Sequence, residues 1–267
     1  MNPPSILRVL PATLRIYAVK YWYARRLEAW MPLFTHKELE LAPGVFMDGL
    51  VPGDRISNQI AFTGRWGGHF GEVVLAKGRE GGLMVDVGAN LGYFSLLWAA
   101  AKPGNRVVAV EASPRNHPLL QRNIEGNAMQ DRIRMLGCAV GREKGKLSFA
   151  LGSEIETGWG GFTTRTDEKS VEVDVERLDA LLADETIIDL MKVDIEGADT
   201  WAIQGCEGLL KAKRIKELWF EENKPRMKRL GIERAEVMDF LRGCGYEVEA
   251  MSEPRFFQTV EWRARPR

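Results

Sequence analysis

One segment constrains the fold of this chain more than any other: Leu83-Met-Val-Asp-Val-Gly-Ala-Asn-Leu-Gly-Tyr-Phe94. A short apolar run ends in an acid, a loop spaced Asp86-x-Gly88-x-Asn90-x-Gly92 follows, and an apolar helical pattern comes next. Glycines let a loop approach a ligand closely and adopt positive φ, and the helix after it offers unpaired N–H groups. The segment therefore predicts a strand, a turn and a helix around a nucleotide-sized pocket.

A second acid extends this pattern. Residues 106–111 form another apolar run that ends in Glu111, about 20 residues beyond the loop, where a Rossmann-type strand presents a carboxylate to a ribose diol. The loop lacks the middle glycine of the dinucleotide fingerprint G-x-G-x-x-G, and no P-loop lysine follows it. S-adenosylmethionine (SAM) has a sulfonium, an ammonium and a ribose but no phosphate. An acid at the strand end, Asp86, therefore favours SAM over a dinucleotide.

From Leu83 onward, strand patterns alternate with helical ones, which predicts an α/β fold with a mostly parallel sheet covered by helices on both faces. The expected strands are residues 83–87, 106–111, 133–138, 188–194, 215–221, 246–251 and 256–264. The last two strands should form an antiparallel hairpin, unlike the dinucleotide-binding fold. We predict helices at 114–127, 200–210 and 234–243, the first of them capped by Ser113.

An insertion, residues 145–175, interrupts this alternation. Two strand-like segments flank the Gly- and Thr-rich stretch 152–168, which is either disordered or a lid over a substrate. Two aromatic residues in this stretch, Trp159 and Phe162, either stack on an acceptor ring or pack in the interior.

A second strand–turn–helix pattern is Leu190-Met-Lys-Val-Asp-Ile-Glu-Gly-Ala-Asp199. Ligands of open α/β sheets lie outside the carboxyl ends of the strands, so the acids at four strand ends should face one site. These acids are Asp86, Glu111, Asp194 and Glu221. Such a cluster is costly to desolvate unless a cationic or hydroxyl-rich ligand compensates it.

Composition narrows the functional classes. The chain has 267 residues, enough for one large domain or a domain with an appendage. Lys+Arg and Asp+Glu balance at 37 each, which argues against a global basic field for nucleic acid. Cys138, Cys206 and Cys244 form no CxxC pair, which fits a reducing compartment and argues against a cysteine zinc site. With no membrane span or signal peptide apparent, we expect a cytoplasmic protein.

Residues 6–30 combine apolar and aromatic residues at helical spacing with interspersed basic residues. Two interpretations stay open. The helix packs on the domain or on a second subunit, as in a homodimer, or it lies at a membrane surface.

Taken together, these segments resemble the FkbM family of SAM-dependent methyltransferases. The likeness spans about residues 46–222, and its most specific parts are DVGAN at 86–90 and KVDIEGA at 192–198. It implies a class I methyltransferase domain over 46–267, with 46–82 covering the cofactor, after a helical extension over 1–45. It also implies O-methylation of a small-molecule hydroxyl on a sugar, a glycan or a polyketide-type metabolite.

The resemblance also implies site residues. Glu111 would bind the ribose hydroxyls, and Cys138 and Ala139 would flank adenine chiefly through their backbone. The whole cofactor-binding set is Asp86, Gly88, Ala89, Asn90, Gly92, Glu111, Ala112, Cys138, Ala139 and Asp194.

Methyl transfer to a hydroxyl requires that the acceptor oxygen is positioned and its proton accepted. Asp194 is the first candidate for the base, Glu196 the second, and Glu221 completes the catalytic set. A divalent metal is a less favoured alternative, held by the hard oxygen ligands Asp194, Glu222 and Asn223. In the covering segment, His69 is either a substrate-facing base or a surface residue.

Three other functions compete with this interpretation. An NAD-dependent oxidoreductase disagrees with the loop spacing and with the C-terminal hairpin. A non-catalytic SAM-fold scaffold disagrees with the acids kept at the strand ends. A nucleic-acid methyltransferase disagrees with the neutral net charge and with the missing Asn/Asp-Pro-Pro-aromatic motif.

Overall fold

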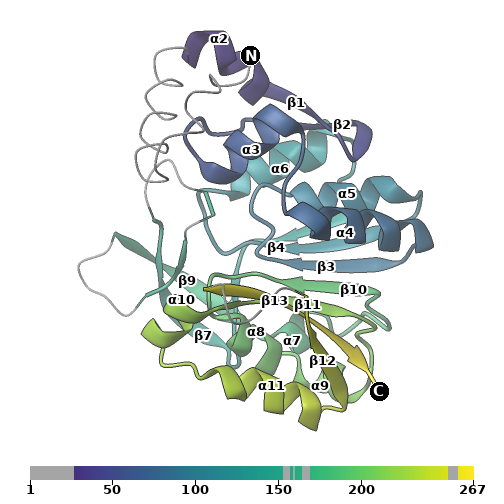
Figure 1. The fold of residues 1–267 in the computed structure, drawn as a ribbon, viewed down its shortest axis with the longest axis vertical. Coiled ribbons are helices and arrows are strands. Elements are labelled where there is room, and N and C mark those ends of the chain that lie inside the picture. Colours follow the sequence, from purple (N-terminus) through teal and green to yellow (C-terminus); the bar gives the residue numbers. More distant parts are fainter. Residues whose placement is uncertain (1–26, 153–156, 159, 164–168, 252–257) are drawn as a thin grey trace.

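The computed structural model describes residues 27–152, 157–158, 160–163, 169–251 and 258–267. Within these residues, a seven-stranded sheet with the order β12-β13-β11-β10-β3-β4-β5 runs through the middle of the molecule (Figure 1). Its strands are β3 (Leu83–Val87), β4 (Arg106–Val110), β5 (Ile133–Leu136), β10 (Leu190–Val193), β11 (Leu218–Asn223), β12 (Tyr246–Ala250) and β13 (Thr259–Pro266). Only β13 is antiparallel to its neighbours in this sheet, and the other strand pairs are parallel. The predicted mostly parallel sheet with an antiparallel C-terminal hairpin is confirmed.

Helices cover both faces of the sheet (Figure 1). One face carries α4 (Gly68–Glu80), α5 (Tyr93–Ala101) and α6 (His117–Gly126), and the other carries α7 (Leu178–Leu181), α8 (Asp199–Gln204), α9 (Glu207–Lys211) and α11 (Arg234–Gly243). Successive side chains of a strand point to opposite faces. Met84 of β3 therefore joins the core under α5, whereas Val85 and Val87 join the core over α8. Because both faces are buried, β3 is an unbroken apolar run apart from Asp86.

Two predicted helix boundaries are wrong. The segment 200–210 forms two helices, α8 and α9, because the chain turns at Gly205, where a Cβ would lie 2.2 Å from the carbonyl oxygen of Gly141. Ser113 does not cap the next predicted helix, since α6 begins only at His117. The backbone N–H of Ser113 and the side chain of Asn116 both donate to the Glu111 carboxylate, so these residues form a turn instead.

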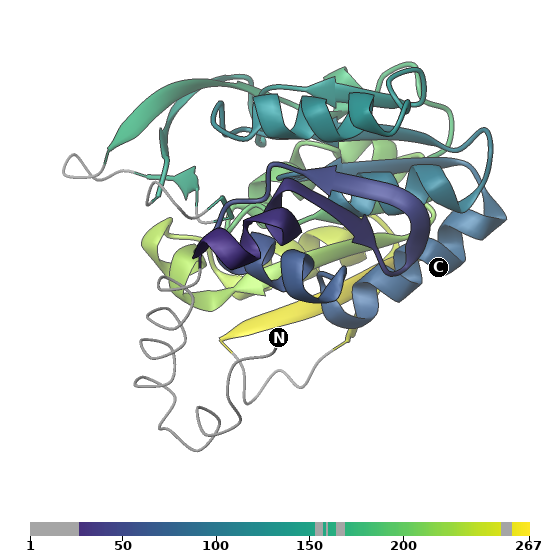
Figure 2. The same cartoon turned by 90° about the horizontal axis from the view of Figure 1, so that it is seen from above.

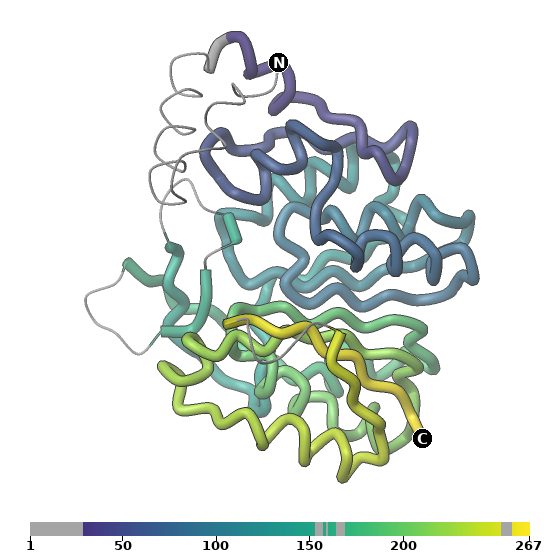
Figure 3. Tube along the Cα trace, viewed as in Figure 1, coloured from purple at the N-terminus to yellow at the C-terminus, as the bar shows by residue number. Residues whose placement is uncertain are grey.

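The order of the strands determines where the sheet can bind a ligand. From β3 the chain builds outward to β4 and β5, and it then returns to the other side of β3 to build β10 and β11 (Figure 3). The loops that follow β3 and β10 therefore lie next to each other at the carboxyl edge. Such a switch point is where open α/β sheets bind their ligands.

The N-terminal elements pack on the α5 side of the sheet. They are α2 (Leu27–Thr35), the hairpin of β1 (His36–Leu39) and β2 (Ala42–Asp48), and α3 (Arg55–Thr63). Trp30 and Phe34 of α2 are buried against Phe62 of α3, with ring centroids 5.2 Å and 5.9 Å apart. Most of the predicted helix 6–30 lies outside the described residues. Among the described residues, no helix has the length and apolar character that a membrane crossing requires.

The insertion forms a second, smaller sheet that extends to one side of the molecule (Figure 2). Its order is β6-β9-β7-β8, with β6 (Ala139–Val140), β7 (Gly145–Ala150), β8 (Gly161–Phe162) and β9 (Ser170–Glu176). The predicted pair of strands is confirmed, because β7 and β9 pair antiparallel over their whole length. Residues 153–156, 159 and 164–168 lie outside the described part, so the choice between lid and disorder for the stretch 152–168 is not tested.

Candidate active site

Two adjoining cavities open at the carboxyl edge of the sheet. We call them the inner pocket, between the ends of β4 and β6, and the outer cavity, about 970 Å³ in volume, between α3 and α10 (Lys224–Arg229). Both are lined by the following residues: Gly88, Asn90, Gly158, Gly161, Phe162, Asp194 and Glu196. A molecule in the inner pocket can therefore reach into the outer cavity.

The glycine loop forms the boundary between the strands. Gly88 has a φ of 78°, and a Cβ there would lie 2.0 Å from the carbonyl oxygen of Asp194. Only glycine allows the loops after β3 and β10 to pack this closely. Gly88, Ala89 and Asn90 line the cavities as predicted, whereas Gly92 supports the loop from behind, close to Leu120.

Asp86 lies beneath the loop and outside the lining of both cavities. Its side chain is fully buried, accepts a hydrogen bond of 2.7 Å from Ser95 Oγ, and lies 3.5 Å from Lys192 Nζ. A direct contact of Asp86 with the methionine end of SAM stays a prediction. The observed contacts give this carboxylate a role in supporting the loop.

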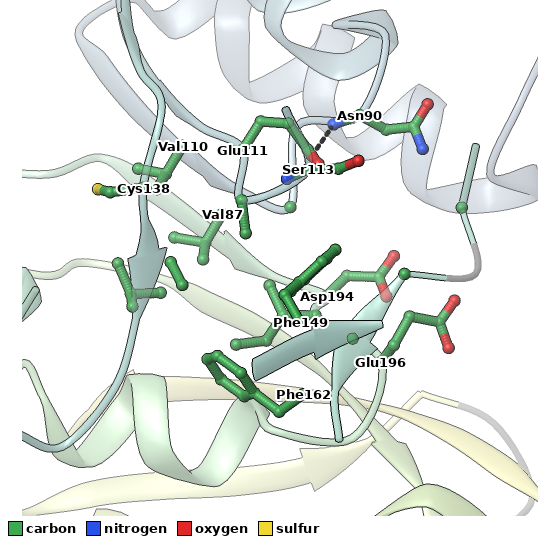
Figure 4. Close-up of a pocket in the computed structure, with 18 of the residues that line it drawn as sticks. Val87, Asn90, Val110, Glu111, Ser113, Cys138, Phe149, Phe162, Asp194 and Glu196 are labelled. Carbon is green, nitrogen blue, oxygen red and sulfur yellow. Dashed lines mark hydrogen bonds between the residues drawn. The ribbon is translucent and has the colours of Figure 1, made fainter. Parts of the chain in front are cut away.

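Glu111 presents its carboxylate to the inner pocket. One oxygen accepts the N–H of Asn90 at 2.8 Å (Figure 4). The other accepts the N–H of Ser113 at 2.9 Å and the side chain of Asn116 at 3.2 Å. Burial raises the pKa of Glu111, and these hydrogen bonds oppose the rise. A carboxylate has about four acceptor positions and three are used here, so capacity for one ribose hydroxyl remains.

Apolar side chains line the rest of the inner pocket. Val87, Val110 and Val140 come from strands of the two sheets, and Phe149 and Phe162 come from the insertion (Figure 4). The predicted adenine neighbours are also in this lining: Ala112, Cys138 and Ala139. The pocket thus combines a flat apolar slot with one anchored carboxylate.

A contact between the insertion and the N-terminal cap of α3 lies beside the inner pocket, and sequence reasoning missed it. Thr157 donates its N–H and its hydroxyl to the Asp54 carboxylate, both at 3.0 Å, and its hydroxyl lies 3.3 Å from Asn90 Oδ1. Asp54 also caps α3 by accepting the N–H of Ser57. One buried acid therefore holds together the covering segment, the insertion and the glycine loop.

Three acids lie at the end of β10 and β11. Asp194 and Glu196 line both cavities, and Glu221 lines the outer one. In Figure 4 the Asp194 and Glu196 side chains follow the end of β10 and extend in the same direction. Glu196 has a φ of 58°, a backbone conformation that is uncommon without glycine and typical of constrained functional positions. The three predicted catalytic residues are thus brought together.

Two of these acids hold their protons more tightly than usual. Burial raises the pKa of Glu196 to about 7, although Arg226, whose Nε lies 3.2 Å from its carboxylate, opposes the rise. Burial and then the charge of Asp194 raise the pKa of Glu221 to about 8. Carboxyl groups that titrate near neutrality are suited to general acid–base catalysis.

Lys192 completes the site, and sequence reasoning missed it. Its Nζ lies 3.5 Å from Asp86, 3.6 Å from Asp194 and 3.2 Å from the carbonyl oxygen of Gly88, with the side chain 7% exposed. Burial lowers the pKa of Lys192, but the carboxylates of Asp194, Asp86 and Asp199 outweigh this effect and raise it overall. A lysine in an otherwise apolar strand was the available signal.

The structure does not assemble the proposed metal ligands. Glu222 points to the opposite face of the sheet from Asn223, because neighbouring strand residues alternate. Its carboxylate lies 3.0 Å from Arg234 Nε and accepts a hydrogen bond of 3.0 Å from Trp262. No group of three or more His, Cys, Asp or Glu side chains suited to a metal ion occurs among the described residues.

The predicted substrate residues differ in their positions. Phe162 lines both cavities, and Trp159 lies outside the described residues. His69 is 71% exposed in the first turn of α4, lies 3.8 Å from Glu72, and is absent from both cavity linings. The structure thus places His69 on the surface, and a contact with substrate stays a prediction.

Comparison with known proteins agrees with this geometry. Residues 86–248, more than half of the chain, match the family model of the methyltransferase FkbM domain. The chain belongs to the FkbM family of methyltransferases. It is a SAM-dependent enzyme of this family with a class I, Rossmann-like fold.

Curated relatives of this FkbM-family methyltransferase include the 31-O-demethyl-FK506 methyltransferase FkbM of Streptomyces tacrolimicus. It is 26% identical over 68% of this chain and 78% of its own length. Methyltransferase 1 of Beauveria bassiana is 26% identical over 46% of this chain, and the match spans 58% of that relative. Among solved structures, the O-methyltransferase of Bacillus cereus in complex with S-adenosylhomocysteine (SAH) is 14% identical, covering 75% of this chain and 82% of that one, with a TM-score of 0.44.

The residues present fit SAM. The inner pocket offers a buried carboxylate for a ribose hydroxyl and an apolar lining for a base, and Gly88 leaves room where a Cβ would collide with the neighbouring loop. Acids line the continuation into the outer cavity, where a cationic sulfonium would be attracted.

Replacing Glu111 by alanine should weaken SAH binding about tenfold or more, because hydrogen bonds to a charged acceptor contribute about 1.5–3 kcal/mol. Isothermal titration calorimetry measures this directly. Glu143→Ala, which removes an exposed acid outside both cavities, is the matched control. Unchanged affinity in Glu111→Ala would show that the ribose is bound elsewhere.

Proposed function

We propose that this FkbM-family enzyme transfers the methyl group of SAM to a hydroxyl oxygen of a small molecule. The observation that carries the proposal is a group of three carboxyl side chains: Asp194 and Glu196 at the junction of the two cavities, and Glu221 in the outer one. An alcohol becomes a competent nucleophile as its proton leaves, and these groups are placed to accept it. The name of the Streptomyces relative, a 31-O-demethyl-FK506 methyltransferase, supports an oxygen acceptor.

Different segments of the chain bind different parts of SAM and of the acceptor. We assign Glu111 to the ribose, the slot around Cys138 and Ala139 to adenine, and the loop Gly88–Asn90 to the methionine end. SAM, when bound, supplies an electrophilic methyl group on a sulfonium that is itself the leaving group. The outer cavity positions the acceptor oxygen, and positioning alone supplies a large part of the rate.

We further propose that the acceptor is small rather than a nucleic acid. The outer cavity, about 970 Å³ in volume, is lined by α3, α10 and the insertion, and the Thr157–Asp54 contact lies beside it. The balanced net charge of the chain also gives no long-range attraction for a polyanion. Dimerisation or membrane contact through residues 6–30 stays a prediction.

The test is methyl transfer from radiolabelled SAM to a panel of hydroxylated sugars, polyols and phenols, with the product identified by mass spectrometry. We expect an O-methyl ether to form with at least one class. Transfer only to amines or thiols would contradict the proposal, as would SAH binding without transfer to any hydroxyl.

The rate of methyl transfer at saturating substrates should rise with pH and level off above about 8. A base must be unprotonated to act, and the pKa values of Glu196 and Glu221 are raised to about 7 and about 8. Below these values the ionised fraction falls about tenfold for each pH unit. A pH–rate profile measures this rise.

The Glu221→Gln variant, if it retains measurable turnover, should show an inflection near 7, because Glu196, with a pKa of about 7, then remains as a candidate base. Asp239→Asn changes an exposed acid on α11 and should keep the wild-type profile. A flat wild-type profile between pH 6 and pH 9 would exclude both glutamates as the base.

A further inference from the structure

The walls of the outer cavity differ in charge from its floor. The floor carries the acids Asp194, Glu196 and Glu221, whereas two arginines stand on opposite walls. Arg55 is the first residue of α3, and Arg229 is the last residue of α10. The two helices lie on opposite sides of the central sheet's carboxyl edge (Figure 1).

Arg55 is held at the cavity wall by an aromatic side chain and not by an acid. Its guanidinium carbon lies 5.5 Å from the centroid of the Trp66 ring, and both residues line the cavity. Asp54, its neighbour in sequence, is already engaged by Ser57 and Thr157. Across the part of the chain that the structure describes, no carboxylate lies within ion-pair distance of Arg55.

Arg229, on the opposite wall, likewise has no carboxylate within ion-pair distance among the described residues. One turn earlier on α10, Arg226 forms an ion pair with Glu196. No such acid accompanies Arg229 in the described part of the chain. Arg229 is one of three basic side chains in the last turn of α10. Helix α10 thus contributes one arginine to the floor and another to the wall.

Two other cations that line the cavity have acidic partners. Lys192 lies between Asp86 and Asp194, and Arg226 is paired with Glu196. Glu221, with its pKa raised to about 8, is mostly neutral at pH 7 and does not offset the arginines. The two guanidinium groups therefore leave a positive potential at the mouth of the cavity, above a floor that handles protons.

We propose that the methyl acceptor is a small hydroxy compound with an anionic group, a phosphate or a carboxylate, that Arg55 and Arg229 bind at the mouth of the outer cavity. Guanidinium groups bind both anions through two parallel hydrogen bonds. Trp66, whose ring faces the Arg55 guanidinium, would hold that side chain in place at the cavity wall. This inference rests on the proposed hydroxyl methylation and names the class of its substrate.

The experiment uses the full chain saturated with SAH and measures binding of three sugars by calorimetry. Glucose 6-phosphate and glucuronate carry the two anions, and methyl glucoside is the neutral control. We expect one or both anionic sugars to bind about tenfold or more tightly than methyl glucoside. Arg55→Gln and Arg229→Gln should each weaken that binding severalfold and leave SAH affinity unchanged. Arg242→Gln, on the far surface of α11, should change neither.

The two anions give separate outcomes. Preference for glucose 6-phosphate alone assigns a phosphate, and preference for glucuronate alone assigns a carboxylate. Equal or undetectable binding of all three sugars overturns the inference, as does anion binding that both arginine variants retain. Because these measurements need no methyl transfer, they stand apart from the proposed function. Transfer to neutral hydroxyl compounds as fast as to anionic ones would support that function and overturn this inference.

Discussion

The Asp194→Asn variant should transfer methyl groups about 10²- to 10⁴-fold more slowly than the wild-type enzyme, the range over which a positioned base acts. Its SAH affinity should change only severalfold, because we assign the ribose to Glu111 and adenine to the slot around Cys138 and Ala139. Asp194 lies at the junction of the two cavities and is 41% exposed there. It also raises the pKa values of Glu196 and Glu221 through its charge.

The second effect separates a catalytic role from a structural one. Without the negative charge of Asp194, the pKa values of both glutamates should fall, so the pH–rate profile should level off at lower pH. A variant that is merely misfolded would lose activity without moving the inflection. Steady-state kinetics over a pH series, with Asp239→Asn as control, measures both quantities. Wild-type turnover in Asp194→Asn would remove this residue from the catalytic set.

The sheet could be predicted because its strands are buried on both faces. Each of the runs 83–87, 106–111 and 188–194 is mostly apolar and has an acid at its last or second-last position, so the sequence indicates both the parallel strand and its functional edge. The glycine loop could also be predicted, since only glycine fits at position 88, where the loops after β3 and β10 touch. These features could be predicted because each depends on residues that are close together in the sequence.

Contacts between distant segments could not be read in this way. Asp54 has the sequence pattern of a helix cap. The residues next to it in the sequence do not indicate that Thr157 binds the same carboxylate. Glu222 could not be separated from Asn223 until the strand register was known, because one position decides which face a side chain joins. Sequence therefore identified the acids of the site but not the side chains that pair with them.

Replacing Lys192 by methionine should lower the free energy of unfolding by about 3 kcal/mol, because removing one member of a buried ion pair leaves the other uncompensated. Asp86 is fully buried, and Lys192 is the cation beside it, at 3.5 Å. The same ammonium binds the carbonyl oxygen of Gly88 at 3.2 Å, so SAH binding should weaken as the glycine loop loosens. Urea unfolding measures the stability, and calorimetry measures the affinity.

A second substitution tests the cause. Lys192→Met combined with Asp86→Asn should recover part of the lost stability, because the uncompensated charge is then absent. The double-mutant cycle isolates this coupling from the general cost of altering a core strand. Lys216→Met is the matched control, since this lysine pairs with Asp189 at 2.7 Å but is 61% exposed, and surface pairs contribute little. If the effects of the two substitutions simply add, or if Lys192→Met costs no more than Lys216→Met, the ion pair does not support the glycine loop. Asp86 must then be stabilised by Ser95 alone.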